Sequence, residues 1–270
     1  MKISNEFKKN FLKTIKTIGI ILLKNRNKYL NKGKWVKGQY HNTIDRKINK
    51  IFNEKLKKIL DVEIQSEEKI IKVNYKKNLY WLIDPIDGTA SYSNGFDGFV
   101  TQAALIENNK PILSAVYAPK LDLLFYAVKN KGAFLNNGRI FIKKKKFIKT
   151  IIDNFKVPTG ISRELYEELK CEKYIESGSL GLKSCLIASN EADIFVKDIH
   201  VKIWDVAPAM LIMSELGGKI TDFYGKKIIF NKSLLIHGLI VSQSSSHNNK
   251  ILKILKNKKK KVKQYLTIYK

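Results

Sequence analysis

The stretch that decides the fold is Trp81-Leu82-Ile83-Asp84-Pro85-Ile86-Asp87-Gly88-Thr89. It begins with an apolar run typical of a short buried strand and ends in two carboxylates, those of Asp84 and Asp87, three positions apart. Pro85 fixes the backbone between them, and Gly88 permits a tight turn after them. Two carboxylates at the end of a strand can bridge a pair of hard cations, and Mg²⁺ prefers such oxygen ligands.

The same stretch offers a further oxygen ligand and two hydrogen-bond donors. The carbonyl oxygen of Ile86, between the two carboxylates, can act as another metal ligand. The backbone amides of Gly88 and Thr89 would then be free to hold a phosphate oxygen. A surface β-turn is the competing interpretation, because Asp-Pro and Asp-Gly are common turn dipeptides.

Two other acidic positions favour the metal site over the turn. Glu67 and Glu68 follow a predicted strand at residues 62–65, and Asp205 lies at the predicted start of a helix. Taken alone, Asp205 would be an ordinary helix cap. Facing the two aspartates of the first stretch, it would complete a second metal position.

Hydrophobic periodicity predicts alternating helices and strands around these motifs. Predicted helices lie at residues 5–30, 44–60, 162–170, 180–189, 205–216 and 247–258, with a loop at 31–42. Predicted strands lie at residues 62–65, 80–83, 99–107, 111–117, 123–128, 193–197, 219–223 and 237–242. This order predicts an α/β (α+β) layered sandwich of alternating helix and sheet layers.

The absence of a Pro-rich or Ser-rich linker predicts one domain spanning residues 1–270. We expect two lobes within it, at about residues 1–150 and 151–245, followed by a basic C-terminal tail at 246–270. No signal peptide is recognisable, and no apolar run approaches the roughly 20 residues that a membrane span needs. A cytoplasmic protein with no membrane span is therefore the expectation.

Composition indicates a chain with a sizeable core and a high positive charge. Hydrophobic residues make up 44% of the 270 positions, and 51 Lys and Arg against 24 Asp and Glu give a formal net charge of +27. Such a charge favours polyanionic partners, but the lysines are spread along the whole chain, which favours compositional bias. The two cysteines form no CxxC pair, so neither a disulfide framework nor a zinc site is indicated.

Taken in order, three of these segments resemble the signatures of the inositol monophosphatase superfamily. The matching stretches are Ser66-Glu67-Glu68, Asp84-Pro85-Ile86-Asp87-Gly88-Thr89 and Trp204-Asp205-Val206-Ala207. The resemblance covers about residues 30–245. It implies that superfamily's layered fold, a metal-dependent phosphomonoesterase with two or three Mg²⁺ ions, a small phosphorylated substrate and, as one option, a homodimer.

The resemblance also implies a role for each matching position. The implied metal ligands are Glu67, Asp84, Asp87, Asp205 and the Ile86 carbonyl. The implied catalytic group adds Asp45 and Thr89, which match the pair that orients the attacking water, to Glu67. One ion would lower the pKa of a bound water while others neutralise charge on the phosphate.

The chain departs from the superfamily pattern at two positions. Asn42 stands three residues before Asp45, where members often have Thr. Pro208 falls in the first turn after Asp205, where many members have Ala or Gly. Because proline is tolerated in a first helical turn, we expect the site to survive this change.

Several features resemble the 3′(2′),5′-bisphosphate nucleotidase branch, which implies conversion of 3′-phosphoadenosine 5′-phosphate to AMP. Among them are Ser66-Glu67-Glu68 and Leu182-Lys183-Ser184-Cys185-Leu186, and Lys183 or Lys197 could meet a second phosphate. An inositol-1-monophosphatase is the alternative, because Asp198 could accept hydrogen bonds from a polyol. The substrate-binding residues so implied are Gly88, Thr89, Lys183, Lys197, Asp198 and Asp205.

A third hypothesis comes from another class of protein. The high charge suits a catalytically idle, basic nucleic-acid- or lipid-binding protein built on the same fold. The intact set of carboxylates argues against it, as does the lack of an RNA-binding motif with interleaved aromatic residues. No specific nucleic-acid partner is therefore expected.

Overall fold

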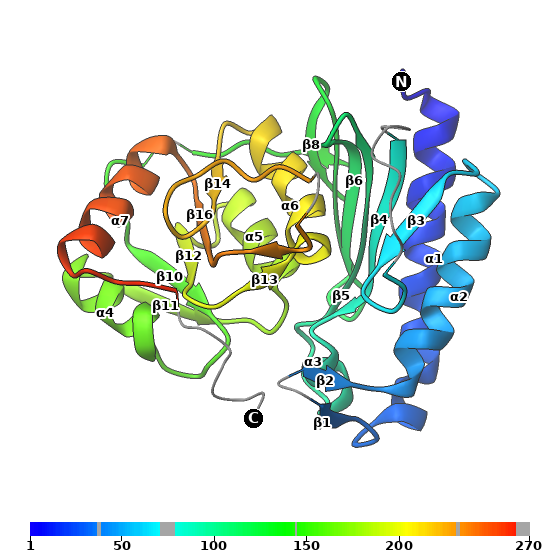
Figure 1. The fold of residues 1–270 in the computed structure, drawn as a ribbon, viewed down its shortest axis with the longest axis horizontal. Helices are drawn as coiled ribbons and strands as arrows, with labels where there is room; N and C mark the ends of the chain where they lie inside the picture. Colours follow the sequence, from blue (N-terminus) through cyan, green and yellow to red (C-terminus); the bar gives the residue numbers. More distant parts are fainter. Residues whose placement is uncertain (37–38, 71–78, 144, 231–232, 263–270) are drawn as a thin grey trace.

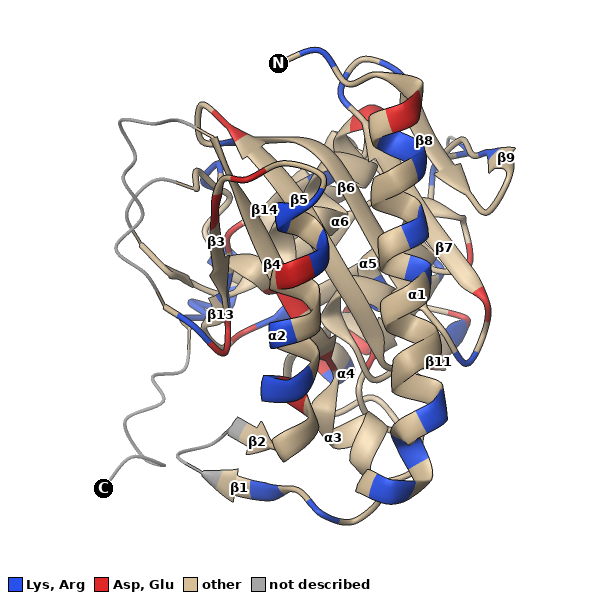
Figure 2. Cartoon of the chain, turned by 90° about the vertical axis from the view of Figure 1, so that its right-hand side faces the viewer, with Lys and Arg blue, Asp and Glu red and all other residues tan. Residues whose placement is uncertain are grey.

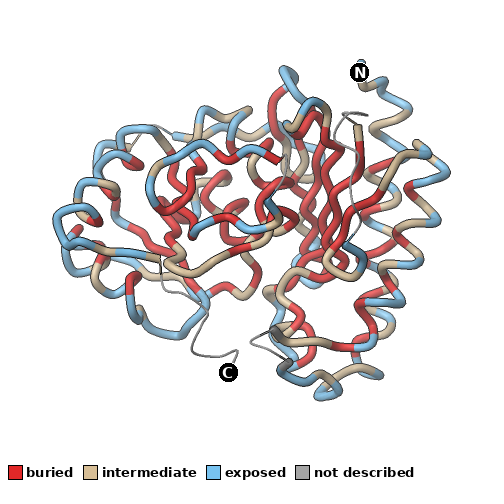
Figure 3. The backbone as a smooth tube through the Cα atoms, viewed as in Figure 1, coloured by how far each residue is buried: buried red, intermediate tan, exposed pale blue. Residues whose placement is uncertain are grey.

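Helix layers and sheet layers alternate across the molecule (Figure 1), as the order of predicted elements indicated. The computed structural model describes all residues except 37–38, 71–78, 144, 231–232 and 263–270. Buried residues concentrate in the strands and in the helices between the two larger sheets, whereas the outer helices are exposed on one side (Figure 3).

The larger sheet has seven strands in the order β3-β4-β5-β6-β7-β8-β9. Its strands are β3 (Glu63–Ser66), β4 (Leu79–Asp87), β5 (Val100–Glu107), β6 (Lys110–Ala118), β7 (Leu123–Val128), β8 (Gly132–Leu135) and β9 (Gly138–Arg139). β3 runs parallel to β4, and the other neighbours are antiparallel. The β5–β6 hairpin turns at Asn108 and Asn109, whose φ angles of 49° and 61° suit asparagine.

Helices α1 (Asn5–Tyr29) and α2 (Thr43–Lys57) cover one face of this sheet (Figure 2). Each buries an apolar stripe in the core beneath it, while its lysines face outward. The predicted loop at 31–42 is wrong in part, because β1 (Lys34–Val36) and β2 (Gln39–His41) pair there. Trp35 and Tyr40 face each other across this short ladder, with ring centroids 5.4 Å apart.

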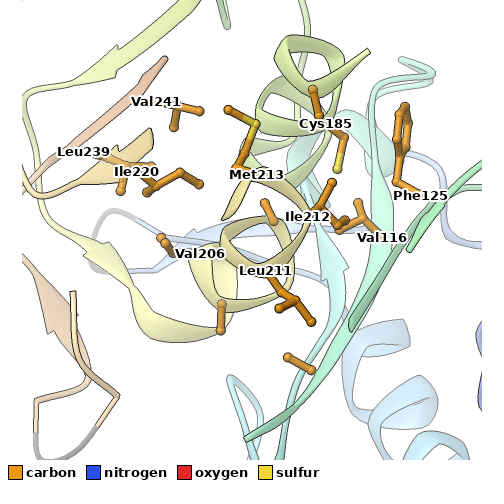
Figure 4. Close-up of a cluster of buried hydrophobic side chains, with 14 of the residues drawn as sticks. Val116, Phe125, Cys185, Val206, Leu211, Ile212, Met213, Ile220, Leu239 and Val241 are labelled. Carbon is orange, nitrogen blue, oxygen red and sulfur yellow. The ribbon is translucent and has the colours of Figure 1, made fainter. Parts of the chain in front are cut away.

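Helices α5 (Leu180–Ala188) and α6 (Ile203–Glu215) fill the layer between the two larger sheets. Both are apolar on most sides, as expected for helices buried all round. Figure 4 shows how α6 joins the layers, with Ile212 toward Val116 of the larger sheet and Met213 toward Ile220 of the other. As a result of this packing, the first turn of α6 lies close to the carboxyl end of β4.

The second sheet has five strands in the order β11-β10-β12-β16-β14. They are β10 (Thr150–Asp153), β11 (Lys173–Glu176), β12 (Ile194–Lys197), β16 (Leu239–Ser242) and β14 (Lys219–Thr221). Helices α4 (Gly160–Glu168) and α7 (Ser245–Asn257) cover its outer face, and β13 (Val201–Lys202) pairs with β15 (Leu235–Ile236) beside it. The chain passes from the larger sheet to the second sheet between β9 and β10, and the division into two lobes near residue 150 stays a prediction.

The segment 246–270, predicted as a basic tail, is a tail only in part. Helix α7 occupies most of its first half, and Ile251 and Leu255 are buried in a core shared with α4 and β16. These two apolar positions, spaced one helical turn apart, give the lysine-rich segment a buried face. In the described part of the chain, no helix is both long and apolar enough to cross a membrane.

Candidate active site

The predicted carboxylates meet at one end of the larger sheet. Because β3 and β4 run parallel, their carboxyl ends lie side by side and bring Glu67 next to Asp84 and Asp87. Asp205 arrives from the first turn of α6. All four side chains line one cleft of about 690 Å³, a volume within the range of small-molecule sites.

The surface-turn interpretation of the first stretch is wrong. β4 continues as a strand to Asp87, with an irregular register between Asp84 and Asp87, and Asp84 is only 1% exposed. Gly88 then turns the chain with a φ angle of 86° and caps the short helix α3 (Thr89–Ser93). This left-handed conformation favours glycine, so the turn after the second carboxylate is built as its sequence predicted.

Burial and mutual repulsion raise the pKa values of the clustered carboxyl groups. Burial raises the pKa of Asp84 well above its usual range, and neighbouring Glu67 and Asp87 add to the effect. Burial, with Asp87 and Glu67, does the same to the pKa of Asp205. The pKa of Glu67 rises to about 8, first through burial and then through nearby carboxylates. A bound cation would remove this repulsion.

The donor set fits a hard divalent cation. Four carboxylates line the cleft together with Ile86, and oxygen-only ligand sets suit Mg²⁺. As the side chains stand in the described ranges, no group of three or more Asp, Glu, His or Cys residues is arranged to hold a metal ion. The case for a metal site therefore rests on the oxygen ligands and on the mutual repulsion of the clustered carboxylates, which a bound cation would relieve.

Asp87 is fixed to the start of α5. Its Oδ2 accepts hydrogen bonds from Ser179 Oγ and the Gly181 amide, each at 2.7 Å, and from Gln102 Nε2 at 3.3 Å. Burial raises the pKa of Asp87, and the hydrogen bonds from the Gly181 amide and Ser179 act against that rise. Gln102 was not predicted to take part, although a buried polar residue inside an apolar strand was a visible signal.

Asp45 and Thr89 lie together, as the resemblance implied. Thr89 Oγ1 lies 3.2 Å from Asp45 Oδ1 and 2.9 Å from the Ile86 carbonyl oxygen. Asp45 Oδ2 accepts a hydrogen bond from the backbone N–H of Asn42 at 3.2 Å, which completes the N-terminal cap of α2. Burial, followed by the charge of Glu68, raises the pKa of Asp45 to about 7. That value suits a group exchanging protons near neutral pH.

The implied specificity residues lie away from the cleft surface. Lys183 is 1% exposed, and its ammonium donates to Asn154 Oδ1 and to the carbonyls of Ser177 and Gly178, behind the cleft wall that these three residues form. Burial, with the charge of Lys197, lowers the pKa of Lys183 to about 7. Neither of these lysines is among the described cleft-lining residues, and Asp198 is not among them either.

An apolar rim borders the carboxylates, and no sequence pattern predicted it. Tyr40, Phe96 and Leu121 come from three distant segments and line the same cleft. Phe96 is 58% exposed and so presents its ring to solvent. The cleft thus combines an anionic, metal-suited end with a surface on which a flat ring can stack.

Fold and site together define a metal-dependent phosphoric monoester hydrolase. The chain matches the model of the Inositol monophosphatase family over residues 7–260 and therefore belongs to that family. The predicted fold class and enzyme class are confirmed. The hypothesis of a catalytically idle binding protein is set aside.

Known relatives carry different names. The chain is 31% identical over 226 residues to the Nus factor SuhB of Xylella fastidiosa, which covers 79% of this chain and 81% of the relative. It is 32% identical over 200 residues to the 3′(2′),5′-bisphosphate nucleotidase CysQ of Haemophilus influenzae, covering 68% and 72%. Staphylococcal IMPase-I, solved with products, has the same fold, with a TM-score of 0.81, 24% identity and coverage of 94% and 96%.

We expect Asp45→Asn to stabilise the protein in a pH-dependent way. A carboxyl whose folded pKa is raised binds its proton more tightly in the folded state, so its ionisation costs stability as pH rises. The cost begins near the usual pKa of 3.8 and is complete above about 7. The melting temperature of metal-free Asp45→Asn should equal that of the wild type near pH 4 and exceed it by roughly 5 °C at pH 7.5. A constant difference across this range would contradict the raised pKa.

Proposed function

We propose that this enzyme is a Mg²⁺-dependent phosphomonoesterase that hydrolyses a 3′(2′),5′-bisphosphonucleoside, such as 3′-phosphoadenosine 5′-phosphate, to the mononucleotide. The observation that carries the proposal is the convergence of four carboxylates in one cleft beside Thr89, whose hydroxyl contacts Asp45. Such a cleft suits attack by a water molecule on a small phosphate ester and requires no covalent intermediate.

The role proposed for each residue is consistent with its position in or beside the cleft. Bound Mg²⁺ would supply a water of lowered pKa and neutralise charge on the phosphate. The side chains of Glu67, Asp84, Asp87 and Asp205, with the Ile86 carbonyl, would hold the ions. Thr89 can donate its single hydroxyl hydrogen to Asp45 Oδ1, so its oxygen can accept a proton from the attacking water as its own proton passes to the Asp45 carboxylate. The Gly88 and Thr89 amides would hold the phosphate.

The apolar rim supports the nucleotide as substrate. Phe96 and Tyr40 offer ring surface beside the carboxylates, and stacking on an aromatic ring contributes substantially to binding of a nucleobase. Similarity to the CysQ nucleotidase supports the same class. The segment around Lys183 gave the same indication in the sequence.

One observation favours an inositol monophosphate as the second candidate. Among the cleft-lining residues that the structure describes, none is Lys, Arg or His. Binding of a second phosphate would therefore depend on the charges of Lys183 and Lys197, which do not line the cleft. Glu176 and Asn154 do line it, and their side chains can bind polyol hydroxyls.

The Phe96→Ala variant separates the two candidates. We expect its KM for 3′-phosphoadenosine 5′-phosphate to rise about 5- to 100-fold, because base stacking is lost, with KM for inositol 1-phosphate unchanged. Phe147→Ala is the matched control, since Phe147 is 57% exposed and does not line the cleft. Equal KM changes for both substrates, or none, would count against the nucleotide.

A second test concerns the two lysines. If their charge reaches a second phosphate, Lys197→Met should raise KM for the bisphosphate selectively, and adding Lys183→Met should raise it further. Unchanged KM values in the properly folded double variant would remove these lysines from substrate recognition. Thermal melting checks the fold, since the buried Lys183 ammonium donates to three oxygen atoms that would lose this partner.

A further inference from the structure

Pro208 leaves a backbone carbonyl of α6 without its helical donor. The residue lies inside α6, which begins at Ile203, and not in a first turn that would tolerate it. In a regular helix the amide at position 208 would donate to the carbonyl of Trp204, four residues earlier. Proline has no N–H, and Trp204 is buried, so another donor is needed there.

Gln102 supplies that donor from the neighbouring strand. Its Nε2 lies 3.3 Å from the Trp204 carbonyl oxygen and 3.3 Å from Asp87 Oδ2. A side-chain amide carries two N–H hydrogens, one for each acceptor. The flipped amide would place its oxygen against two other oxygens, so the chemistry fixes the orientation.

The position of Gln102 is otherwise apolar. Val100, Ala104 and Ile106, at alternate positions of β5, belong to the core between the sheets, and Gln102 is fully buried on the same face. Within the described chain, its Oε1 has no hydrogen-bond partner. An apolar residue would avoid this cost, so the glutamine is better explained by what its amide holds.

Close packing leaves this amide little freedom. A Cβ atom on Gly181 would lie 2.3 Å from Gln102 Oε1 and 3.1 Å from Asp87 Oδ2, so any side chain at position 181 would force the Gln102 amide to move. Gln102, Ser179 and Gly181 all donate to Asp87 Oδ2. Asp87 Oδ1 accepts only the longer 3.3 Å contact from the Leu180 amide in the described structure, and is the oxygen better able to take a metal.

We propose that Gln102 is a positioning residue, anchored on the carbonyl that Pro208 frees and holding Asp87 oriented for metal binding. The inference rests on the proposed metal-ligand role of Asp87. The inference also gives Pro208, a departure from the family pattern, a part in the site. Because Pro208 donates no hydrogen bond to the Trp204 carbonyl, that carbonyl can hold Gln102, a residue outside the family's three signatures.

A double-mutant cycle tests both contacts of the amide. Wild type, Gln102→Met, Pro208→Ala and the double variant would be compared by calorimetric titration with Mg²⁺ and by thermal melting. We expect Gln102→Met to weaken Mg²⁺ binding about 10- to 100-fold in either background, as for other residues that orient metal ligands. Its loss of melting temperature should be smaller in the Pro208→Ala background, where position 208 again supplies an N–H to Trp204.

Two results would overturn the inference. One is a Mg²⁺ dissociation constant for Gln102→Met within about twofold of the wild type, below the effect expected for a positioning residue. The other is an equal loss of melting temperature in both backgrounds. Asp87→Asn separates this failure from that of the proposed function. If Asp87→Asn loses Mg²⁺ affinity and Gln102→Met does not, only the role of Gln102 is wrong. If Asp87→Asn retains affinity, the metal role of Asp87 fails, and the inference fails with it.

Discussion

Asp84→Asn is expected to lower kcat for phosphate release by about 10³-fold or more. The substitution preserves side-chain size but removes the most deeply buried charge of the cleft. A metal ion stabilises the transition state by several kcal/mol, and about 1.4 kcal/mol corresponds to a tenfold change in rate. The measurement is kcat at saturating substrate across a Mg²⁺ titration.

Asp222→Asn is a suitable control for this prediction. Asp222 is also a buried aspartate that accepts backbone hydrogen bonds, but it does not line the cleft. Its kcat should stay within about threefold of the wild type, because substitutions outside a site act mainly on stability. A kcat for Asp84→Asn within tenfold of the wild type would show that the buried carboxylate is dispensable.

Asp45→Asn is expected to lower kcat by about 10²- to 10⁴-fold, the usual contribution of a positioned acid–base group. Its Mg²⁺ affinity should change little, because Asp45 contacts Thr89 and the α2 cap. The same variant should be more stable than the wild type at neutral pH. Lower activity with higher stability cannot come from unfolding, so the two measurements together identify the role of the carboxylate.

Thr89 variants provide the matched comparison. Thr89→Ser keeps the hydroxyl between Asp45 and the Ile86 carbonyl and should retain most of the activity. Thr89→Val keeps the shape, loses the hydroxyl, and should lose activity to a similar extent as Asp45→Asn. Similar activity in both Thr89 variants would exclude the proposed proton contact.

The carboxylate centre could be predicted from sequence because its parts are locally encoded. Asp84 and Asp87 end a strand whose apolar run and following glycine are visible in nine residues. The approach of Asp205 is different, since it depends on α6 packing between two sheets. Only the order of three motifs, and not periodicity, indicated that contact.

The positions of the residues proposed to shape specificity could not be predicted from spacing. Lys183 belongs to a helix that is apolar on most sides, so no apolar stripe shows which side chains are buried. The sequence pattern therefore could not show that its ammonium lies behind the cleft wall, where three oxygen atoms accept its hydrogen bonds. Tyr40 and Phe96 reach the rim through tertiary contacts between distant segments, and the role proposed for Gln102 depends on a missing N–H in another element.

The most direct test of the account is phosphate release from 3′-phosphoadenosine 5′-phosphate and from inositol 1-phosphate, with and without Mg²⁺, beside the Asp87→Asn variant. The account predicts release that requires Mg²⁺ and that Asp87→Asn abolishes, with the bisphosphonucleoside as the faster substrate. Release that continues without divalent cations, or that Asp87→Asn leaves intact, would contradict it.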